Sequence, residues 1–190
     1  MQFINLQSQQ ARIKKQLEKR LSKVLNHGQY IMGPEVFELE EILAEYVSVK
    51  HCISCSSGTD ALLISLLATK IGVGDAVLTT PFTYIATAEI IALLGATPIF
   101  IDIYESTYNI NPNGIDDAIK HAYDKGLNPK AIIPVDLFGL PARYRLIEEK
   151  AKEHNLLIIE DAAQGFGGQI KAELACSFGH ISTTSFFPAK

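Results

Sequence analysis

Apolar residues in the first fifty positions recur at the three- and four-residue spacing of a helix that buries one face. They are Ile13, Leu17, Leu21, Val24 and Leu25. The spacing predicts a helix over 8–26, and Gly28 and Gly33 interrupt the pattern after it. A second helix is predicted over 34–47, because Pro34 suits the first helical position and acidic residues follow it at the positive end of the helix dipole.

Beyond residue 50, short and almost wholly apolar runs alternate with segments of helical periodicity. The apolar runs are 51–55, 76–80, 98–102, 131–135, 156–160 and 181–187. The helical segments between them are 58–70, 83–94, 112–121 and 141–154. Strands this apolar are buried on both faces, as in a parallel sheet covered by helices. The pattern predicts one three-layer α/β/α domain with a mostly parallel sheet, and no linker or repeat divides it.

Composition narrows the classes of protein. The 190 residues are 47% hydrophobic and 20% charged, with a net charge of -4, which is typical of a globular protein. No basic stripe indicates a nucleic-acid partner. Gly and Pro interrupt the apolar runs well short of the roughly 20 residues that a membrane helix requires, and the N-terminus lacks signal-peptide features. We therefore expect a cytoplasmic protein that binds neither nucleic acid nor membrane.

Three cysteines, Cys52, Cys55 and Cys176, fit a reducing compartment better than a disulfide framework. Cys52 and Cys55 have the CxxC spacing of some redox and zinc sites. Such a site needs a helix that begins at the first cysteine or a second cysteine pair, and neither is present. We favour the interpretation that they are small buried residues of a strand over 51–55, and expect no metal site.

Polar residues that follow the apolar runs are the candidates for chemistry, because ligands of parallel sheets bind beyond the carboxyl ends of the strands. The stretch SSGTDALL places Gly58, Thr59 and Asp60 at the beginning of a helix, where backbone N–H groups lack partners and can bind an anion. Ordinary helix capping is the alternative. The spacing matches neither the Walker loop nor the GxGxxG fingerprint, so ATP and dinucleotides are disfavoured.

A carboxylate ends the run 156–160. Asp161 comes directly after this apolar strand, where an unpaired negative charge is costly, so it needs a cation as its partner. Alternatively it caps the next turn or pairs with a surface lysine. Gln164, three residues later, can hydrogen-bond either a ligand or a loop carbonyl.

One ligand accounts for these separate features. Lys190 follows the run 181–187, where apolar surroundings would make its amine nucleophilic, and Ser185 lies close enough in sequence to bind the same ligand's phosphate. Pyridoxal phosphate combines a phosphate, an aldehyde that condenses with lysine, and a ring nitrogen that benefits from a carboxylate such as Asp161. Phe82, after 76–80, either covers the face of the ring or is a core aromatic.

Five motifs in order carry a family resemblance: SGTDAL, PFTYIATAEII, PVDLFG, IIEDAAQGFG and TSFFPAK. Together they resemble the DegT/DnrJ/EryC1/StrS family of nucleotide-sugar aminotransferases, which have the fold-type I large domain of pyridoxal phosphate enzymes. The resemblance covers essentially the whole chain. It implies that 1–190 is the cofactor-binding large domain, incomplete, with its remainder and a smaller C-terminal domain absent from this sequence.

The resemblance assigns roles residue by residue. Lys190 would bond to the cofactor and move protons, Asp161 would pair with the ring nitrogen, and Gln164 would bond the phenolic oxygen. The phosphate would be held by Thr59, Asp60 and Ser185 beside Gly58. Phe82 would stack on the ring. A lysine at position 190, where related sugar 3-dehydratases have histidine, indicates the transaminating branch, with L-glutamate as the amino donor.

The acceptor is narrowed by two segments, LNHGQYIMGPEVFELE and CISCSSGTDAL. They are similar to the subgroup that aminates C3 of a UDP-linked 3-oxo-2-acetamido-glucuronate, which implies that Gly28 and Tyr30 contact the nucleotide sugar. A simple turn between two helices is the alternative for these residues. Ala189 and Arg143 depart from the pattern, where relatives often have serine and an acidic residue. Amination of C4 in a UDP- or dTDP-linked 4-keto-6-deoxy sugar remains an alternative.

The resemblance also implies a homodimer with shared active sites, and amino-sugar synthesis for surface polysaccharides such as O-antigen. A chain of 190 residues would lack the side chains that the partner's later region supplies, so we expect such a chain to bind the cofactor weakly. A candidate of another class is a regulatory protein that binds pyridoxal phosphate or a nucleotide sugar without turnover.

Overall fold

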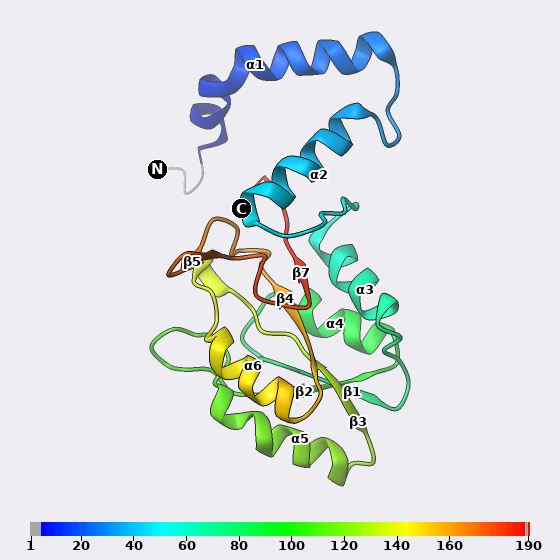
Figure 1. Cartoon of the computed structure of the whole chain (residues 1–190), viewed down its shortest axis with the longest axis vertical. Coiled ribbons are helices and arrows are strands. Elements are labelled where there is room, and N and C mark those ends of the chain that lie inside the picture. Colours follow the sequence, from blue (N-terminus) through cyan, green and yellow to red (C-terminus); the bar gives the residue numbers. More distant parts are fainter. Residues whose placement is uncertain (1–4, 189) are drawn as a thin grey trace. The chain divides into compact units, whose positions relative to one another are not determined.

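The computed structural model describes residues 5–188 and 190, and contacts between residues divide them into two compact units. One unit comprises residues 5–54 with 187–188, and the other comprises 55–186 with 190. Figure 1 shows the elements of each unit coloured along the sequence. In the part of the chain that the structure describes, no helix is both long enough and apolar enough to cross a membrane.

The first unit contains two helices, α1 (Leu6–His27) and α2 (Pro34–Val47), which confirms both helices predicted for this region. The Asn5 side chain caps α1 by accepting a hydrogen bond from the Ser8 amide at 3.0 Å. Gly28 ends α1 with φ = 67°, a left-handed conformation that glycine adopts without a steric penalty.

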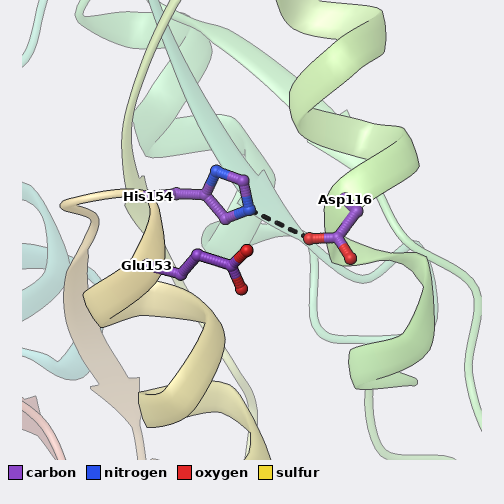
Figure 2. A group of neighbouring side chains, drawn as sticks. All are labelled: Asp116, Glu153 and His154. Atoms are coloured by element: carbon purple, nitrogen blue, oxygen red, sulfur yellow. Dashed lines mark hydrogen bonds and ion pairs between the residues drawn. The ribbon is translucent and has the colours of Figure 1, made fainter.

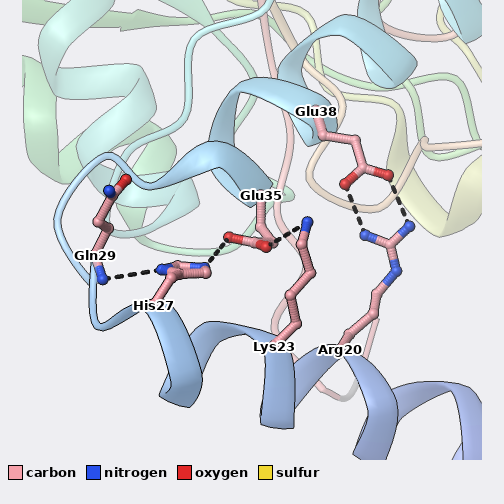
Figure 3. Close-up of polar contacts among 6 residues, drawn as sticks. All are labelled: Arg20, Lys23, His27, Gln29, Glu35 and Glu38. Carbon is pink, nitrogen blue, oxygen red and sulfur yellow. Dashed lines mark hydrogen bonds and ion pairs between the residues drawn. The ribbon is translucent and has the colours of Figure 1, made fainter.

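Ion pairs join α1 to α2 (Figure 3). The Arg20 guanidinium donates to both Glu38 oxygens, at 2.8 and 2.7 Å. Glu35 lies 2.9 Å from the Lys23 ammonium and 3.1 Å from His27 Nε2, and the Lys23 hydrogen bond is the main cause that lowers the Glu35 pKa to about 2. The Gln29 amide donates to His27 Nδ1, so His27 Nε2 carries the hydrogen that points to Glu35.

The second unit is built on a five-stranded sheet in which every pairing is parallel. Its spatial order is β2 (Thr97–Phe100), β1 (Asp75–Thr79), β3 (Asn128–Ile132), β4 (Leu157–Asp161) and β7 (Ile181–Thr183). A short antiparallel pair, β5 (Gln169–Ile170) with β6 (Glu173–Leu174), was not predicted. It consists of two residues per strand, too few for an apolar pattern to indicate.

Helices cover both faces of the sheet, because neighbouring strand residues point to opposite sides. Leu78, Ile132 and Ile158 form one buried cluster with residues of α5 (Ile115–Asp124) and α6 (Tyr144–Glu153). The opposite cluster joins strand residues Val77, Ala131 and Ile159 to α3 (Gly58–Ala68) and α4 (Ala86–Leu93). Single 3₁₀ turns, η1 (Pro112–Gly114) and η2 (Leu137–Gly139), lie in the connections. The predicted three-layer α/β architecture is confirmed.

The strand predicted over 51–55 is wrong. These residues have no regular structure, Ile53 is 84% exposed, Cys55 is exposed and Cys52 is only partly buried. A strand needs a neighbour for its backbone, and here the Ser54 amide donates instead to Glu40 Oε1 at 2.7 Å. The two cysteines are therefore not the buried strand residues that we expected.

We predict that Leu78→Ala lowers the free energy of unfolding by about 2–5 kcal/mol, because Leu78 is fully buried between the layers and its truncation leaves a cavity. Urea denaturation followed by circular dichroism measures the change. Leu93→Ala is the control, because Leu93 is 69% exposed and its loss should cost about 0.5 kcal/mol or less. Equal effects of both substitutions would contradict the layered core.

Candidate active site

Asp161 is the buried carboxylate of the carboxyl edge of the sheet. It is the last residue of β4 and pairs with Thr183 on β7. Its side chain accepts hydrogen bonds from the Thr87 hydroxyl at 2.8 Å and from the Ala163 amide at 3.2 Å. A second threonine, Thr83, lies 2.9 Å from the Thr87 hydroxyl. The carboxylate is therefore held by the first turn of α4 and by the segment that follows its own strand.

Burial raises the pKa of the Asp161 carboxyl, because the charged form loses its hydration. The Thr87 and Ala163 hydrogen bonds act in the opposite direction, and so does the positive charge of Lys190. Lys190 itself is exposed. The structure thus places the two residues that the sequence singled out within electrostatic reach of one another, and Asp161 lacks a close ion-pair partner among the described residues.

The N-terminus of α3 meets the segment that follows β7. A Cβ added to Gly58 would lie 3.0 Å from the Cβ of Ser185, so glycine is what allows this approach. The Ser57 hydroxyl caps the helix by accepting from the Asp60 amide at 3.1 Å. The amides of Gly58 and Thr59, in the first turn, have no intrahelical acceptor. Gly58, Thr59 and Ser185 therefore gather backbone and hydroxyl donors in one place, which suits an anion.

The Asp60 carboxylate has partners of its own. It accepts hydrogen bonds from the hydroxyls of Ser56 and Ser57, and these bonds lower its pKa. A carboxylate that is kept ionised repels a phosphate, so a role for Asp60 in phosphate binding would be indirect, through the serines that it orients. That role stays a prediction.

Gln164 and Phe82 lie beside a group of aromatic rings. The Gln164 Oε1 accepts from the Phe138 amide at 2.9 Å, which leaves the Gln164 NH₂ group as a donor. The Phe82 ring stacks on Tyr108 with centroids 5.2 Å apart, and Phe138 meets it edge-on at 6.5 Å. Tyr108 therefore takes up part of the Phe82 ring surface, and stacking of Phe82 on a ligand stays a prediction.

The predicted substrate contacts, Gly28 and Tyr30, belong to the first unit. Gly28 has the structural task of ending α1, and Tyr30 is 66% exposed. Of the two departures from the family pattern, Ala189 lies outside the described residues. The Arg143 guanidinium lies over the Tyr104 ring, 4.4 Å from its centroid, so a cation–π contact accounts for this residue.

Asp116, Glu153 and His154 bring possible metal-ligand atoms together on the surface of the second unit (Figure 2). Lys150 lies among them, 2.6 Å from Asp116 and 3.2 Å from Glu153, and His154 Nε2 lies 2.9 Å from Asp116. The lysine already supplies the positive charge that these carboxylates need. We therefore interpret these residues as an ion-pair network between α5 and the end of α6 and not as a metal site.

A family model described as the DegT/DnrJ/EryC1/StrS aminotransferase family matches residues 11–190. The chain belongs to this family. The motifs that suggested it are also the segments that build the carboxyl edge of the sheet: the N-terminus of α3, the loop before α4, the end of β4 and the segment after β7.

Individual curated proteins are similar to the chain over its whole length. A UDP-2-acetamido-2-deoxy-3-oxo-D-glucuronate aminotransferase of Pseudomonas aeruginosa is 48% identical over 190 residues, which is 100% of this chain and 51% of that protein. A pleiotropic regulatory protein of Geobacillus stearothermophilus is 40% identical over 99% of this chain and 49% of its own length. The chain spans about half the length of the curated relatives it matches.

A solved structure of a family aminotransferase from Brucella abortus has the same fold. It superimposes with a TM-score of 0.98 at 50% identity, covering 100% of this chain and 51% of that chain. The described architecture is therefore that of the corresponding half of a DegT/DnrJ/EryC1/StrS aminotransferase.

Sequence reasoning missed two residues of this edge, Thr87 and Glu160. Thr87 lies 74 positions before the carboxylate to which it donates. Glu160 ends an apolar run in the sequence, and its composition alone does not indicate that this acid is fully buried and must be paired with donors. The sequence feature that could have identified Thr87 is its position in the first turn of the helix after β1, because polar groups gather at the carboxyl edge of a parallel sheet.

We predict that Thr87→Val lowers the free energy of unfolding by about 1–3 kcal/mol, because the buried Asp161 carboxylate loses a donor while the shape of the side chain is kept. The same change should raise the Asp161 pKa further, since the Thr87 hydrogen bond lowers it. Urea denaturation and NMR titration of the aspartate carboxyls measure the two effects. Thr87→Ser keeps the hydroxyl, so its free energy of unfolding and its Asp161 pKa should be close to those of the wild type. If they match those of Thr87→Val, the hydroxyl does not cause the two effects.

Proposed function

We propose that this chain carries the cofactor-binding half of a pyridoxal phosphate-dependent aminotransferase. The enzyme moves an amino group from L-glutamate to C3 of a UDP-linked 3-oxo-2-acetamido sugar acid. The supporting observation is the buried carboxylate of Asp161 at the carboxyl edge of the sheet, with Lys190 within electrostatic reach. The family model that matches the chain is described as an aminotransferase family, and amino transfer by such enzymes uses this cofactor.

The residues present fit pyridoxal phosphate. Asp161 is buried and its pKa is raised, so a positively charged ring nitrogen beside it would supply the ionic partner that the described residues do not. The approach of Gly58 to Ser185 makes a cradle that any larger residue at position 58 would obstruct. When bound, the cofactor supplies an electron sink that stabilises the carbanion formed after a proton is removed from the amino donor.

Each protein group then has one task. The Asp161 carboxylate keeps the ring nitrogen protonated, and Thr87 holds the carboxylate in place. The amides of Gly58 and Thr59 with the Ser185 hydroxyl hold the phosphate. The Gln164 NH₂ group donates to the cofactor's phenolic oxygen, and Phe82 covers the ring.

Lys190 has the one covalent role in this proposal. Its amine would hold the cofactor by condensing with the aldehyde with loss of water, and it would be available to carry a proton once the amino donor has displaced it. The amine must be neutral to attack the aldehyde. The apolar surroundings that the sequence led us to expect for Lys190 are a wrong prediction, because Lys190 is exposed and Phe186 is 57% exposed.

The identity of the sugar that accepts the amino group is the most specific part of the proposal. The Pseudomonas aeruginosa relative, at 48% identity over the whole chain, is named for a 3-oxo sugar acid linked to UDP, which favours C3 over C4. Gly28 and Tyr30 are the proposed contacts to the nucleotide sugar. The proposal also includes a cytoplasmic homodimer with shared active sites, and a place in the synthesis of surface-polysaccharide amino sugars.

Covalent labelling tests the proposal at Lys190. The whole enzyme that contains this chain is incubated with pyridoxal phosphate and treated with borohydride, and its peptides are mapped by mass spectrometry. We expect a reduced pyridoxyl group on Lys190, no label at this position in Lys190→Ala, and full labelling of Lys190 in Lys152→Ala. Absence of the label, or a label confined to other lysines, would sink the assignment.

Turnover by the whole enzyme tests the roles of Asp161 and of the acceptor. Asp161→Asn should reduce kcat by about 10²-fold or more, because an uncharged amide no longer stabilises the protonated ring nitrogen. The rate of amino transfer from L-glutamate measures this effect. NMR of the product should place the new amino group at C3 of the UDP-linked 3-oxo sugar acid. Faster amination of C4 in a 4-keto-6-deoxy sugar would contradict the proposed acceptor.

A regulatory role is the second candidate, favoured by the 40% identical relative named a pleiotropic regulatory protein. A protein of this kind would carry the label on Lys190 and yet transfer no amino group from L-glutamate to any UDP- or dTDP-linked keto-sugar. Labelling and turnover together therefore separate the two candidates.

A further inference from the structure

A second acidic group lies behind Asp161 and is not used by the proposed chemistry. Asp136 and Glu160 are both fully buried. Asp136 precedes η2, and Glu160 is the residue before Asp161 on β4. They are close enough for a hydrogen bond between their side chains. Two ionised carboxylates have no hydrogen to share, so this pair demands an explanation.

Glu160 is surrounded by donors. Its Oε1 accepts from the Cys176 amide at 2.6 Å, and its Oε2 accepts from the Phe178 amide at 2.9 Å and the Ser182 hydroxyl at 2.6 Å. The Gly179 amide adds a longer bond at 3.3 Å. A carboxyl that receives hydrogen bonds on both oxygens is stabilised in its ionised form, because a proton on either oxygen would oppose those donors.

Asp136 is satisfied on only one side. Its Oδ1 accepts from the Ala142 amide at 3.0 Å and from the Tyr144 hydroxyl at 2.8 Å. Its Oδ2 is buried and has no donor among the described residues. Asp136 Oδ2 is therefore the oxygen of this carboxyl that can carry a proton without opposing a donor.

We propose that Asp136 is a protonated positioning residue whose carboxylic acid hydrogen is donated to ionised Glu160. The bond ties the segment 136–142 to the end of β4. The Asp136 amide donates to the Asp161 carbonyl at 3.0 Å, and a Cβ on Gly165 would lie 2.7 Å from the Asp136 Cβ. The acid pair thus holds together the segments that carry Asp161 and Gln164.

The surrounding charges agree with this protonation. Burial and then the Glu160 charge raise the pKa of Asp136 to about 8, while the Tyr144 hydroxyl and the Ala142 amide lower it. Tyr144, on α6, has its own pKa raised by burial and by Asp136, so it stays a neutral donor. Asp161 is the other acid of this group, and Lys190 acts on Asp161.

Infrared spectroscopy of the protein with ¹³C-carboxyl aspartate detects the proton directly. At pH 7 we expect a carboxylic acid band that shifts with the aspartate label, that fades as the pH rises through about 8, and that Asp136→Asn removes. Asp161→Asn should keep it. Tyr144→Phe should keep it to higher pH, because the hydroxyl lowers the Asp136 pKa. No band at pH 7, or one that only Asp161→Asn removes, overturns the proposal.

Stability gives an independent measurement. The folded protein keeps a proton that an unfolded aspartate loses above its ordinary pKa, so this contribution to stability falls as the pH rises from acid toward about 8. The Asn side chain of Asp136→Asn carries permanent N–H donors that do not titrate. The urea midpoint of this variant should therefore rise relative to that of the wild type as the pH increases toward about 8, and the difference should stay constant at higher pH. A midpoint difference that does not vary with pH overturns the proposal.

Asp75→Asn is the matched control. Asp75 lies 2.9 Å from Lys130 and has a lowered pKa, so it is ionised in the folded protein. The urea midpoint of Asp75→Asn should therefore fall relative to that of the wild type as the pH rises from acid to neutral. This change is opposite in sign to the one expected for Asp136→Asn. The proton on Asp136 does not depend on the proposed function. A missing band with Lys190 labelled would defeat this inference alone, and an unlabelled Lys190 with the band present would defeat only the proposed function.

Discussion

The second unit depends on how two consecutive acids, Glu160 and Asp161, are buried at the end of one strand. Neighbouring strand residues point to opposite faces of a sheet, so the two carboxyls enter different environments. A buried carboxylate without partners is costly, and each must therefore be satisfied by the elements on its own side. β4 lies between β3 and β7, so partners can come from both neighbours as well as from the covering helices.

The two acids are satisfied in different ways. Glu160 receives the amides of the turn at 176–179 and the Ser182 hydroxyl, which fixes the connection into β7. Asp161 receives one hydroxyl from α4 and one amide from its own loop, fewer donors than Glu160 has. A carboxylate with spare acceptor capacity at the ligand-binding edge of a sheet is the one available to a ligand. The number of protein donors thus separates the two acids: Glu160, with more donors, has a structural role, and Asp161, with fewer, is the candidate for binding a ligand.

Much of this arrangement can be read from the sequence, because its causes are local. The period of the apolar residues predicts α1, α2 and the layered helices, and the acid that ends an apolar run predicts the buried carboxylate. The parts that cannot be predicted depend on distant partners. Thr87 and Asp161 are 74 positions apart, and nothing near either residue indicates the bond between them. The run 51–55 has the composition of a strand but forms none. Its Ser54 amide donates a hydrogen bond to the distant Glu40 side chain and not to a neighbouring strand.

A buried carboxyl can become tolerable in two ways, by holding a proton or by facing a cation, and this edge of the sheet has one candidate for each. Asp136 faces the charge of Glu160 and forms no ion pair among the described residues, so holding a proton is the more favourable solution. Burial raises the Asp161 pKa, the Lys190 charge acts against that rise, and a cation brought closer would lower the pKa. Ionisation of Asp161 and binding of a positively charged ring are then thermodynamically linked: each favours the other by the same free energy. A carboxylate more fully satisfied by protein donors would lack this linkage, so under the proposed function the incomplete satisfaction of Asp161 is what would let the site respond to its ligand.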